Sequence, residues 1–209
     1  MTSVLDSLTR KPDRAGDRAM LDELLDEVMV GTLSTVVDGL PWSVPMLFGR
    51  DGDDILLHGS TGAGALRHVA DGAPVTFTVY SMDGIVVADN LFDHSANYRS
   101  AVVRGVPDRV DDARSVLELL SDKLIPGRVA EVRDMTAKEV AATLAMRLPI
   151  VDGQWIVKAR RGGPSSPSDA WTGVVPVRTV YGAPVTYTGE TPPESVQALA
   201  ESGGTPLVG

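Results

Sequence analysis

The chain of 209 residues contains no cysteine. Disulfide bonds, thiolate catalysis, iron–sulfur clusters and cysteine-ligated zinc are therefore excluded together. Histidine occurs only three times, at His58, His68 and His94, and no spacing matches a metal-binding pattern such as H-E-x-x-H. We accordingly expect no metal site built from side chains.

Long apolar runs are also missing. The longest are short runs such as residues 85–88, far below the ~18 apolar residues of a membrane-spanning helix. The first twenty residues also contain no apolar stretch that suits a signal peptide. The 28 acidic side chains outnumber the 19 basic ones, and the net charge of −9 repels nucleic acid and anionic lipid. These features predict a cytoplasmic protein that binds neither nucleic acid nor membrane.

The residues that are present predict a chain dominated by short antiparallel strands. Segments rich in Val, Thr, Leu and Phe alternate with the pairs Asp38-Gly39, Asp51-Gly52 and Asp83-Gly84, and Asp-Gly tolerates the positive φ angles of tight hairpin turns. A sheet of several such strands usually closes into a barrel or sandwich, because closure removes exposed edges. We expect strands at 30–37, 42–48, 54–58, 75–81, 85–89, 100–109, 150–159 and 171–177.

Helices decorate this predicted sheet. Apolar residues at helical spacing predict helices over 17–27 and 111–124, and a short helix follows the glycines near residue 64. Thr136 and Glu139 form a capping-box pattern, which predicts a further helix that ends at Pro149. We interpret residues 1–188 as a single domain, mainly β with helical decorations, and residues 189–209 as a weakly ordered tail.

A glycine-rich segment, LLHGSTGAGALRHVA at 56–70, joins a predicted strand to the short helix. Glycines allow backbone N–H groups to converge, hydroxyls can donate, and a helix N-terminus carries partial positive charge, so the segment suits a phosphate. It lacks the G-K-[ST] of a P-loop and the glycine spacing of a Rossmann turn. A flexible surface connection explains it equally well.

A second polar segment, FDHSANYRSAVVRG at 92–105, enters an otherwise apolar strand. Its Tyr-Arg-Ser run can hold a ribityl chain or a phosphate, and it can equally be the polar edge of a strand. Neither segment identifies a ligand by itself.

Five segments in order give the chain a specific resemblance: HGSTGAGALR, DGIVVADNLFDHSANYRSAVVRG, PGRVAEVRDMTAKEVAAT, IVKARRGGP and WTGVVPV. The chain resembles the flavin-nucleotide-binding, nitroimidazole-reductase-like branch of the pyridoxamine 5′-phosphate oxidase-like superfamily. The resemblance implies an antiparallel FMN-binding split β-barrel that forms a homodimer, with FMN in a groove at the subunit interface. It also implies a flavin-dependent oxidoreductase acting on a small organic substrate. The implied cofactor-binding residues are Pro45, Met46, Leu47, His58, Gly59, Ser60, Thr61, Gly62, Tyr98, Arg99, Ser100, Lys158 and Trp171.

The chain departs from the family pattern in two places. Many relatives carry a basic group after the turn where this chain has Ala63-Gly64-Ala65, so Arg67 or Arg99 is expected to supply the phosphate counter-charge. The C-terminal substrate motif of the oxidase, which contains Arg and Trp, is absent from the last forty residues. We therefore do not expect pyridoxamine-phosphate oxidase activity itself.

Several alternatives stay open at this point. The same barrel can serve a non-catalytic protein that binds a flavin or haem, with His58 or His94 as the axial ligand, and FAD or a deazaflavin could replace FMN. His58 either donates a hydrogen bond to the flavin or substrate or is structural, and Trp171 either stacks on the cofactor or belongs to the core. No residue pattern singles out a catalytic acid or base, because hydride chemistry belongs to the flavin itself.

Overall fold

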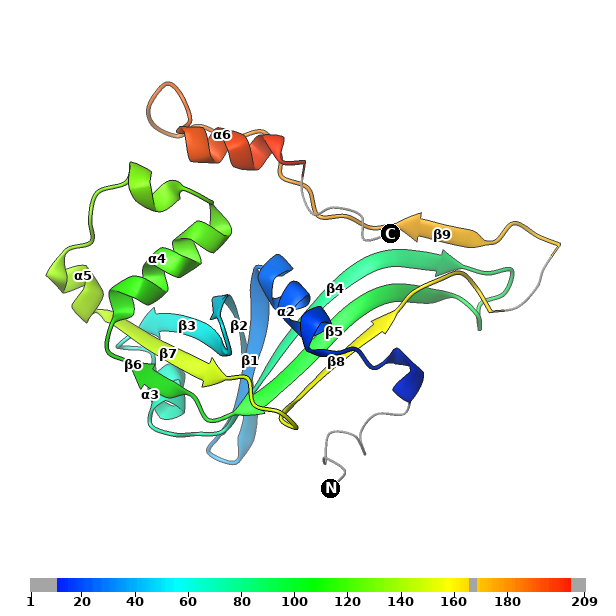
Figure 1. Ribbon diagram of the computed structural model, residues 1–209, viewed down its shortest axis with the longest axis horizontal. Helices are drawn as coiled ribbons and strands as arrows, with labels where there is room; N and C mark the ends of the chain where they lie inside the picture. Colours follow the sequence, from blue (N-terminus) through cyan, green and yellow to red (C-terminus); the bar gives the residue numbers. More distant parts are fainter. Residues whose placement is uncertain (1–10, 166–168, 204–209) are drawn as a thin grey trace.

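The computed structural model describes residues 11–165 and 169–203, and it has the expected split β-barrel (Figure 1). All pairings are antiparallel, and the strand order is β6-β7-β3-β2-β1-β4-β5-β8, with β9 paired to β4. The strands are β1 (Val30–Val37), β2 (Leu40–Asp51), β3 (Asp54–Ser60), β4 (Val75–Val87), β5 (Ser95–Gly105), β6 (Asp108–Val110), β7 (Thr143–Pro149), β8 (Trp155–Arg160) and β9 (Gly173–Pro176). The helices are η1 (Pro12–Arg14), α2 (Arg18–Glu27), α3 (Gly64–Ala70), α4 (Ala113–Leu124), η2 (Arg128–Glu131), α5 (Ala137–Ala141) and α6 (Glu194–Glu201).

The hydrophobic core lies inside the curl of the strands, and α2 packs against it. Asp17 caps this helix, because its carboxylate accepts a hydrogen bond from the backbone N–H of Met20 at 3.0 Å. Three leucines of α2, Leu21, Leu24 and Leu25, are fully buried against the inward-facing residues of the strands. The helix predicted at 17–27 is thus confirmed, and its apolar stripe does lie on the barrel.

The Asp-Gly pairs behave in two ways. Asp38 and Gly39 have φ angles of 52° and 77° and turn β1 into β2, as predicted. The predicted turn at Asp83-Gly84 is wrong, because β4 runs without interruption from Val75 to Val87. The pairing with β5 shifts register between Met82 and Gly84, so the extra residue forms a β-bulge rather than a hairpin.

The helix predicted to end at Pro149 is also wrong. The capping box at Thr136 and Glu139 is present, yet α5 ends at Ala141 and β7 begins at Thr143. β7 pairs with β3 along its whole length, which buries apolar side chains that the local pattern had assigned to a helix. The strand predicted at 150–159 begins only at Trp155, after a turn.

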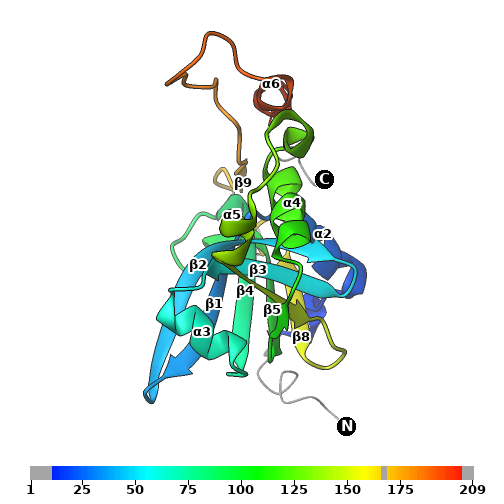
Figure 2. The ribbon, with the colours of Figure 1, turned by 90° about the vertical axis from the view of Figure 1, so that its left-hand side faces the viewer.

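Helix α4 covers the outer side of β3 and β7, where Val116 and Leu120 pack on Leu56 and Ala145 (Figure 2). Lys123, near its end, donates hydrogen bonds of 2.7 Å to the carbonyls of Leu25 and Val28 at the end of α2. Its Nζ lies 3.6 Å from the ring centroid of Phe48. Burial lowers the pKa of Lys123 to about 8. In the described ranges, no helix has both the length and the apolar character needed to cross a membrane.

The segment after β9 returns to the helical side of the molecule, where α6 lies beside η2 (Figure 1). Glu131 of η2 accepts hydrogen bonds from the backbone N–H and the hydroxyl of Ser195, at 3.0 and 2.5 Å. These bonds, with a smaller contribution from Arg128, lower the pKa of Glu131. The expected tail therefore contains a docked helix, while its last residues, 204–209, lie outside the described part.

Candidate functional site

A seam opens between β2 and β3 where the two strands diverge. Their pairing ends at Phe48 and Leu57; β2 continues along β1, whereas β3 continues along β7 as far as Ser60. The segment Pro45-Met46-Leu47 and the segment that begins at His58 therefore face each other across the split of the barrel. Both sides of the seam carry residues that the family resemblance implies as cofactor contacts.

The three residues on the β2 side of the seam point in different directions. Met46 packs against the core, whereas Pro45 and Leu47 are exposed on the outer face of the sheet, and 37% of Leu47 is accessible. A ligand in the seam would thus meet the side chains of Pro45 and Leu47 and the backbone of Met46.

His58 stands on the β3 side of the seam. It is half-buried, and its Nδ1 is buried without a hydrogen-bond partner among the described residues. Burial lowers the pKa of His58, which favours the neutral imidazole. A neutral imidazole can take part in hydrogen bonds or bind a metal centre through a nitrogen that the ligand can reach.

The turn that follows His58 does not offer the expected phosphate cradle. The N–H groups of Thr61, Gly62 and Ala63 already donate to the Ala142 carbonyl at 3.1 Å, the Ser60 Oγ at 3.1 Å and the Ser60 carbonyl at 2.9 Å. The expectation that these amides converge on a phosphate is therefore corrected. They hold the turn together instead.

Two other residues of this region have clear positions. Leu66 of α3 lies directly over Gly59, where a Cβ would collide with it, so the glycine allows the close approach of the helix. Arg67 is exposed on α3 and makes no ion pair among the described residues. Of the two arginines expected to supply phosphate counter-charge, Arg67 is the accessible one.

Arg99 is buried among carboxylates, whereas the sequence analysis expected it to be accessible to a phosphate. Its guanidinium is 2% exposed and donates to both carboxylate oxygens of Glu27, at 2.5 and 2.8 Å, and to Asp83 at 2.8 and 3.1 Å. These partners raise its pKa further above the ordinary value. The β4 bulge at Asp83 presents the second carboxylate. This burial corrects the expectation that Arg99 lies open to a cofactor phosphate.

Tyr98, Ser100 and Lys158 lie together on the outer face of the sheet. In the β5–β8 register Tyr98 is opposite Arg160 and Ser100 is opposite Lys158, so all four side chains share that face. β1 and β4 lie between β5 and the β2 side of the seam, and β8 lies one strand further, so three to four strand spacings, about 14 Å or more across the sheet, separate the two groups. The structure thus places Pro45, Leu47 and His58 at the seam and Tyr98, Ser100 and Lys158 in a second group, rather than all of them in one pocket.

Trp171 lies away from both groups, just before β9. It is 71% exposed, and its indole ring lies against Gly173, where a Cβ would come within 3.0 Å of a ring atom. It therefore does not belong to the core. Stacking of this ring on a cofactor stays a prediction.

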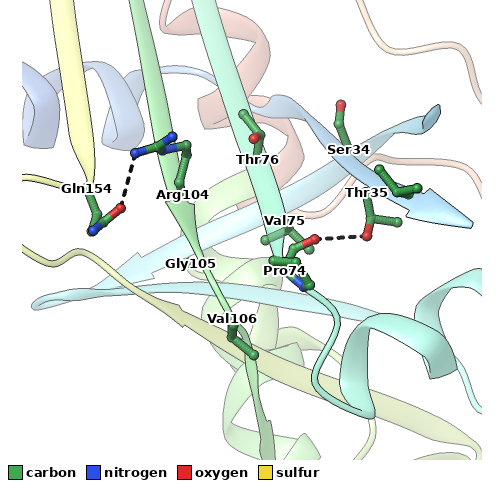
Figure 3. Close-up of a pocket in the computed structure, with 10 residues that line it drawn as sticks. Ser34, Thr35, Pro74, Val75, Thr76, Arg104, Gly105, Val106 and Gln154 are labelled. Atoms are coloured by element: carbon green, nitrogen blue, oxygen red, sulfur yellow. Dashed lines mark hydrogen bonds between the residues drawn. The ribbon is translucent and has the colours of Figure 1, made fainter. Parts of the chain in front are cut away.

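A hollow of about 730 Å³ lies at another part of the outer face (Figure 3). Ser34, Thr76, Arg104 and Gln154 line it, and the Arg104 Nη2 donates to the Gln154 Oε1 at 3.4 Å. The Arg104 Nε is buried and has no hydrogen-bond partner among the described residues. The sequence analysis missed this hollow, because its lining comes from strand segments with no shared motif.

Comparison with known proteins identifies the family and confirms the fold. The sequence pattern of the family described as pyridoxamine 5′-phosphate oxidase matches residues 17–155, which is more than half of the chain. The chain belongs to this family. No curated protein matched the chain in sequence.

Two solved structures of family-like fold cover nearly the whole chain. A FAD and haem binding protein from Mycobacterium smegmatis has a TM-score of 0.85 and 42% identity, and the match covers 91% of this chain and 98% of that one. A flavocytochrome from Azotobacter vinelandii has a TM-score of 0.82 and 26% identity, with 91% and 94% covered. The resemblance stated from the sequence and the split-barrel fold are therefore both confirmed.

Proposed function

We propose that this protein binds a flavin nucleotide and works as a flavin-dependent oxidoreductase on a small organic substrate. The observation that carries the proposal is the seam between β2 and β3, where the edges of Met46 and His58 that face the seam have no strand partner among the described residues. Backbone groups at such an edge can bond the polar edge of an isoalloxazine ring. The similarity to a FAD and haem binding protein favours FAD, with FMN as the other flavin. A cytoplasmic location is part of this proposal.

The proposal includes a homodimer that uses the outer face of the sheet. Thr32, Thr78, Val102 and Ile156 form one row of uncharged side chains across β1, β4, β5 and β8. Neighbouring apolar side chains on β4, such as Tyr80 at 70% exposure, are open in the single chain. A second copy on this face would cover them. It would also bring the Tyr98 and Lys158 group of one subunit towards the seam of the other.

The first test is flavin retention. Purified protein is mixed with FAD or FMN, passed over a desalting column and measured between 300 and 600 nm. We expect a retained flavin spectrum and bleaching of that spectrum by NADH, NADPH or a partner reductase. If neither flavin is retained, the proposal fails.

A matched pair of variants places the flavin at the seam. Leu47→Glu puts a carboxylate at the seam, whereas Leu40→Glu puts the same group at the exposed hairpin end of the same strand. We expect flavin retention to fall at least tenfold in the first variant only. Equal retention in both would place the flavin elsewhere.

Thr78→Arg tests the dimer. It introduces a charge in the middle of the uncharged row. We expect sedimentation to show a dimer for the wild type and a monomer for the variant, with loss of flavin in parallel. A monomeric wild type would contradict this part of the proposal.

Haem is a second candidate ligand, and His58 is the observation that favours it. Its neutral, half-buried imidazole lies at the seam, where a ligand would meet it. By contrast, the Nε2 of the exposed His68 contacts the Val36 carbonyl at 3.0 Å, and the Nε2 of the exposed His94 contacts the Ala88 carbonyl at 3.1 Å.

The haem test compares the three histidines. After addition of haem, we expect a Soret band that is lost or shifted in His58→Ala and unchanged in His68→Ala and His94→Ala. A Soret band that survives His58→Ala removes that residue as the axial ligand.

A further inference from the structure

A polar hollow of about 460 Å³ lies at the edge of β8, outside the residues assigned to the seam. The N-terminal segment forms one wall: the Gly16 N–H donates to the Val157 carbonyl at 2.9 Å, and Ala15 bridges to Lys158. Arg14 therefore lies beside the end of β8, where Arg160 and Arg161 supply the other wall. Arg14 thus joins Arg160 and Arg161, although it is far from them in the sequence.

The charge in this hollow is unbalanced. Among the described residues that line it, Asp13 is the single acidic one. In the part of the chain that the structure describes, Arg14, Arg160 and Arg161 form no ion pair with a carboxylate. Ion pairs do involve the following arginines: Arg18, Arg50, Arg99, Arg109, Arg114, Arg128, Arg133 and Arg147.

Neutral partners hold two of these arginines in place. Arg160 donates to the Asn97 Oδ1 at 2.7 Å, and Arg14 donates to the Tyr98 hydroxyl at 3.3 Å. A neutral partner fixes the direction of a guanidinium but leaves its charge uncompensated. Three such charges in one hollow, in a chain with a net charge of −9, repel one another unless an anion joins them.

We propose that this hollow binds the pyrophosphate group of a dinucleotide. Guanidinium groups bind phosphate oxygens in a bidentate way, and two linked phosphates offer enough oxygens for three arginines. The hollow is larger than a pyrophosphate, so the adjoining ribose can enter it. The proposal also explains why the turn at Ser60 can use its amides for its own structure.

The dinucleotide has two possible sources, FAD or a pyridine nucleotide that reduces the flavin. This choice rests on the proposed flavin function, whereas the pyrophosphate site does not. The face that carries Arg160 also carries Tyr98, so a flavin held at the interface could extend its second phosphate towards it.

The experiment measures inorganic pyrophosphate binding to the full chain by calorimetry at low salt. We expect Arg14→Gln and Arg161→Gln each to weaken binding at least tenfold, with Arg178→Gln, an exposed arginine shortly after β9, as the matched control. Arg161→Gln guards against a folding effect, because that side chain is exposed. Absence of pyrophosphate binding, or equal binding by all variants, overturns the proposal.

Nucleotide titrations with the same variants identify the source. If FAD binding weakens while FMN binding stays unchanged, the pyrophosphate belongs to the flavin; if NADH or NADPH binding weakens instead, it belongs to the electron donor. If the variants bind FAD, NADH and NADPH as well as the wild type does, although the wild type binds pyrophosphate, the dinucleotide assignment is overturned. A protein that binds pyrophosphate but retains no flavin would refute the proposed function and leave this site standing.

Discussion

Arg99 and Arg160 lie almost side by side in the sheet but on opposite faces. Arg99 is in register with Ala159, the residue directly before Arg160. On the inner face, Arg99 is surrounded by Glu27 and Asp83; on the outer face, the partners of Arg160 within the described ranges are the neutral Asn97 and backbone carbonyls. An arginine side chain is thus part of the fold at position 99 and available to a ligand at position 160. The difference lies in the carboxylates that the neighbouring elements supply.

The largest effect expected is on stability, from Arg99→Met. The substitution leaves two carboxylates beside the core without their cation, which should lower the free energy of unfolding by about 3 kcal/mol or more. Denaturant titration measures this. A loss below about 1 kcal/mol would mean that water compensates Glu27 and Asp83 fully, and the contrast between the two faces would disappear.

Lys123→Met should lower the free energy of unfolding by less, about 2 kcal/mol, because it removes two charge-assisted hydrogen bonds to carbonyls at the end of α2. Lys138→Met, at an exposed lysine of α5, is the control. The pKa of Lys123 is about 8 in the folded protein and 10.5 ordinarily. The unfolded chain therefore binds more protons between these values, and the wild type should gain stability relative to Lys123→Met as the pH rises through that window. A stability difference between wild type and variant that does not change with pH would contradict the lowered pKa of Lys123.

Glu131→Gln should affect only α6. The pKa of Glu131 is lowered below its ordinary value of 4.5, chiefly by the hydrogen bonds from Ser195. Its contribution is therefore present above about pH 4.5 and is lost as the pH falls through the folded-state pKa. Hydrogen exchange of the α6 peptide, corrected for the intrinsic rate, should show protection that falls on acidification in the wild type. The variant should lack this pH dependence while the strands stay protected.

The smallest effect on stability is expected from Arg161→Gln and Arg160→Gln. Neither removes an ion pair, so the free energy of unfolding should change by less than about 0.5 kcal/mol, although pyrophosphate binding falls. The same denaturant titration measures it. If Arg160→Gln destabilised the protein as much as Arg99→Met, Arg160 would be structural and the two faces would not differ.

Local sequence patterns predicted those elements whose cause is local. The apolar spacing predicted α2, and Asp38-Gly39 predicted the first hairpin. The patterns failed where a distant strand decides the outcome. Residues 143–149 have helical spacing and follow a true capping box, but pairing with β3 makes them a strand.

In the candidate site, too, local features could be predicted from the sequence, whereas features that depend on distant residues could not. The glycine-rich turn was found from its composition, but the acceptor for the Thr61 amide, Ala142, is about eighty residues away and has no sequence signature. Glu27 lies 72 positions from Arg99, so nothing near Arg99 indicated that it would be neutralised. For the same reason the meeting of Arg14 with Arg160 could not be foreseen. Resemblance to a family located the seam, and only the folded chain showed which charges remain uncompensated.

The N-terminal segment has a consequence for the solution behaviour of shortened chains. β8 is the last strand of its side of the sheet, and the contacts of Ala15 and Gly16 cover part of its open edge. A chain cut before Asp17 would keep α2 and the core but uncover this edge, and uncovered edges recruit further strands from other molecules. Such a chain should aggregate more readily on storage. It would also lack Arg14, so the effect of the uncovered edge and the effect of the lost ligand contact would appear together, and a point substitution of Arg14 is needed to tell them apart.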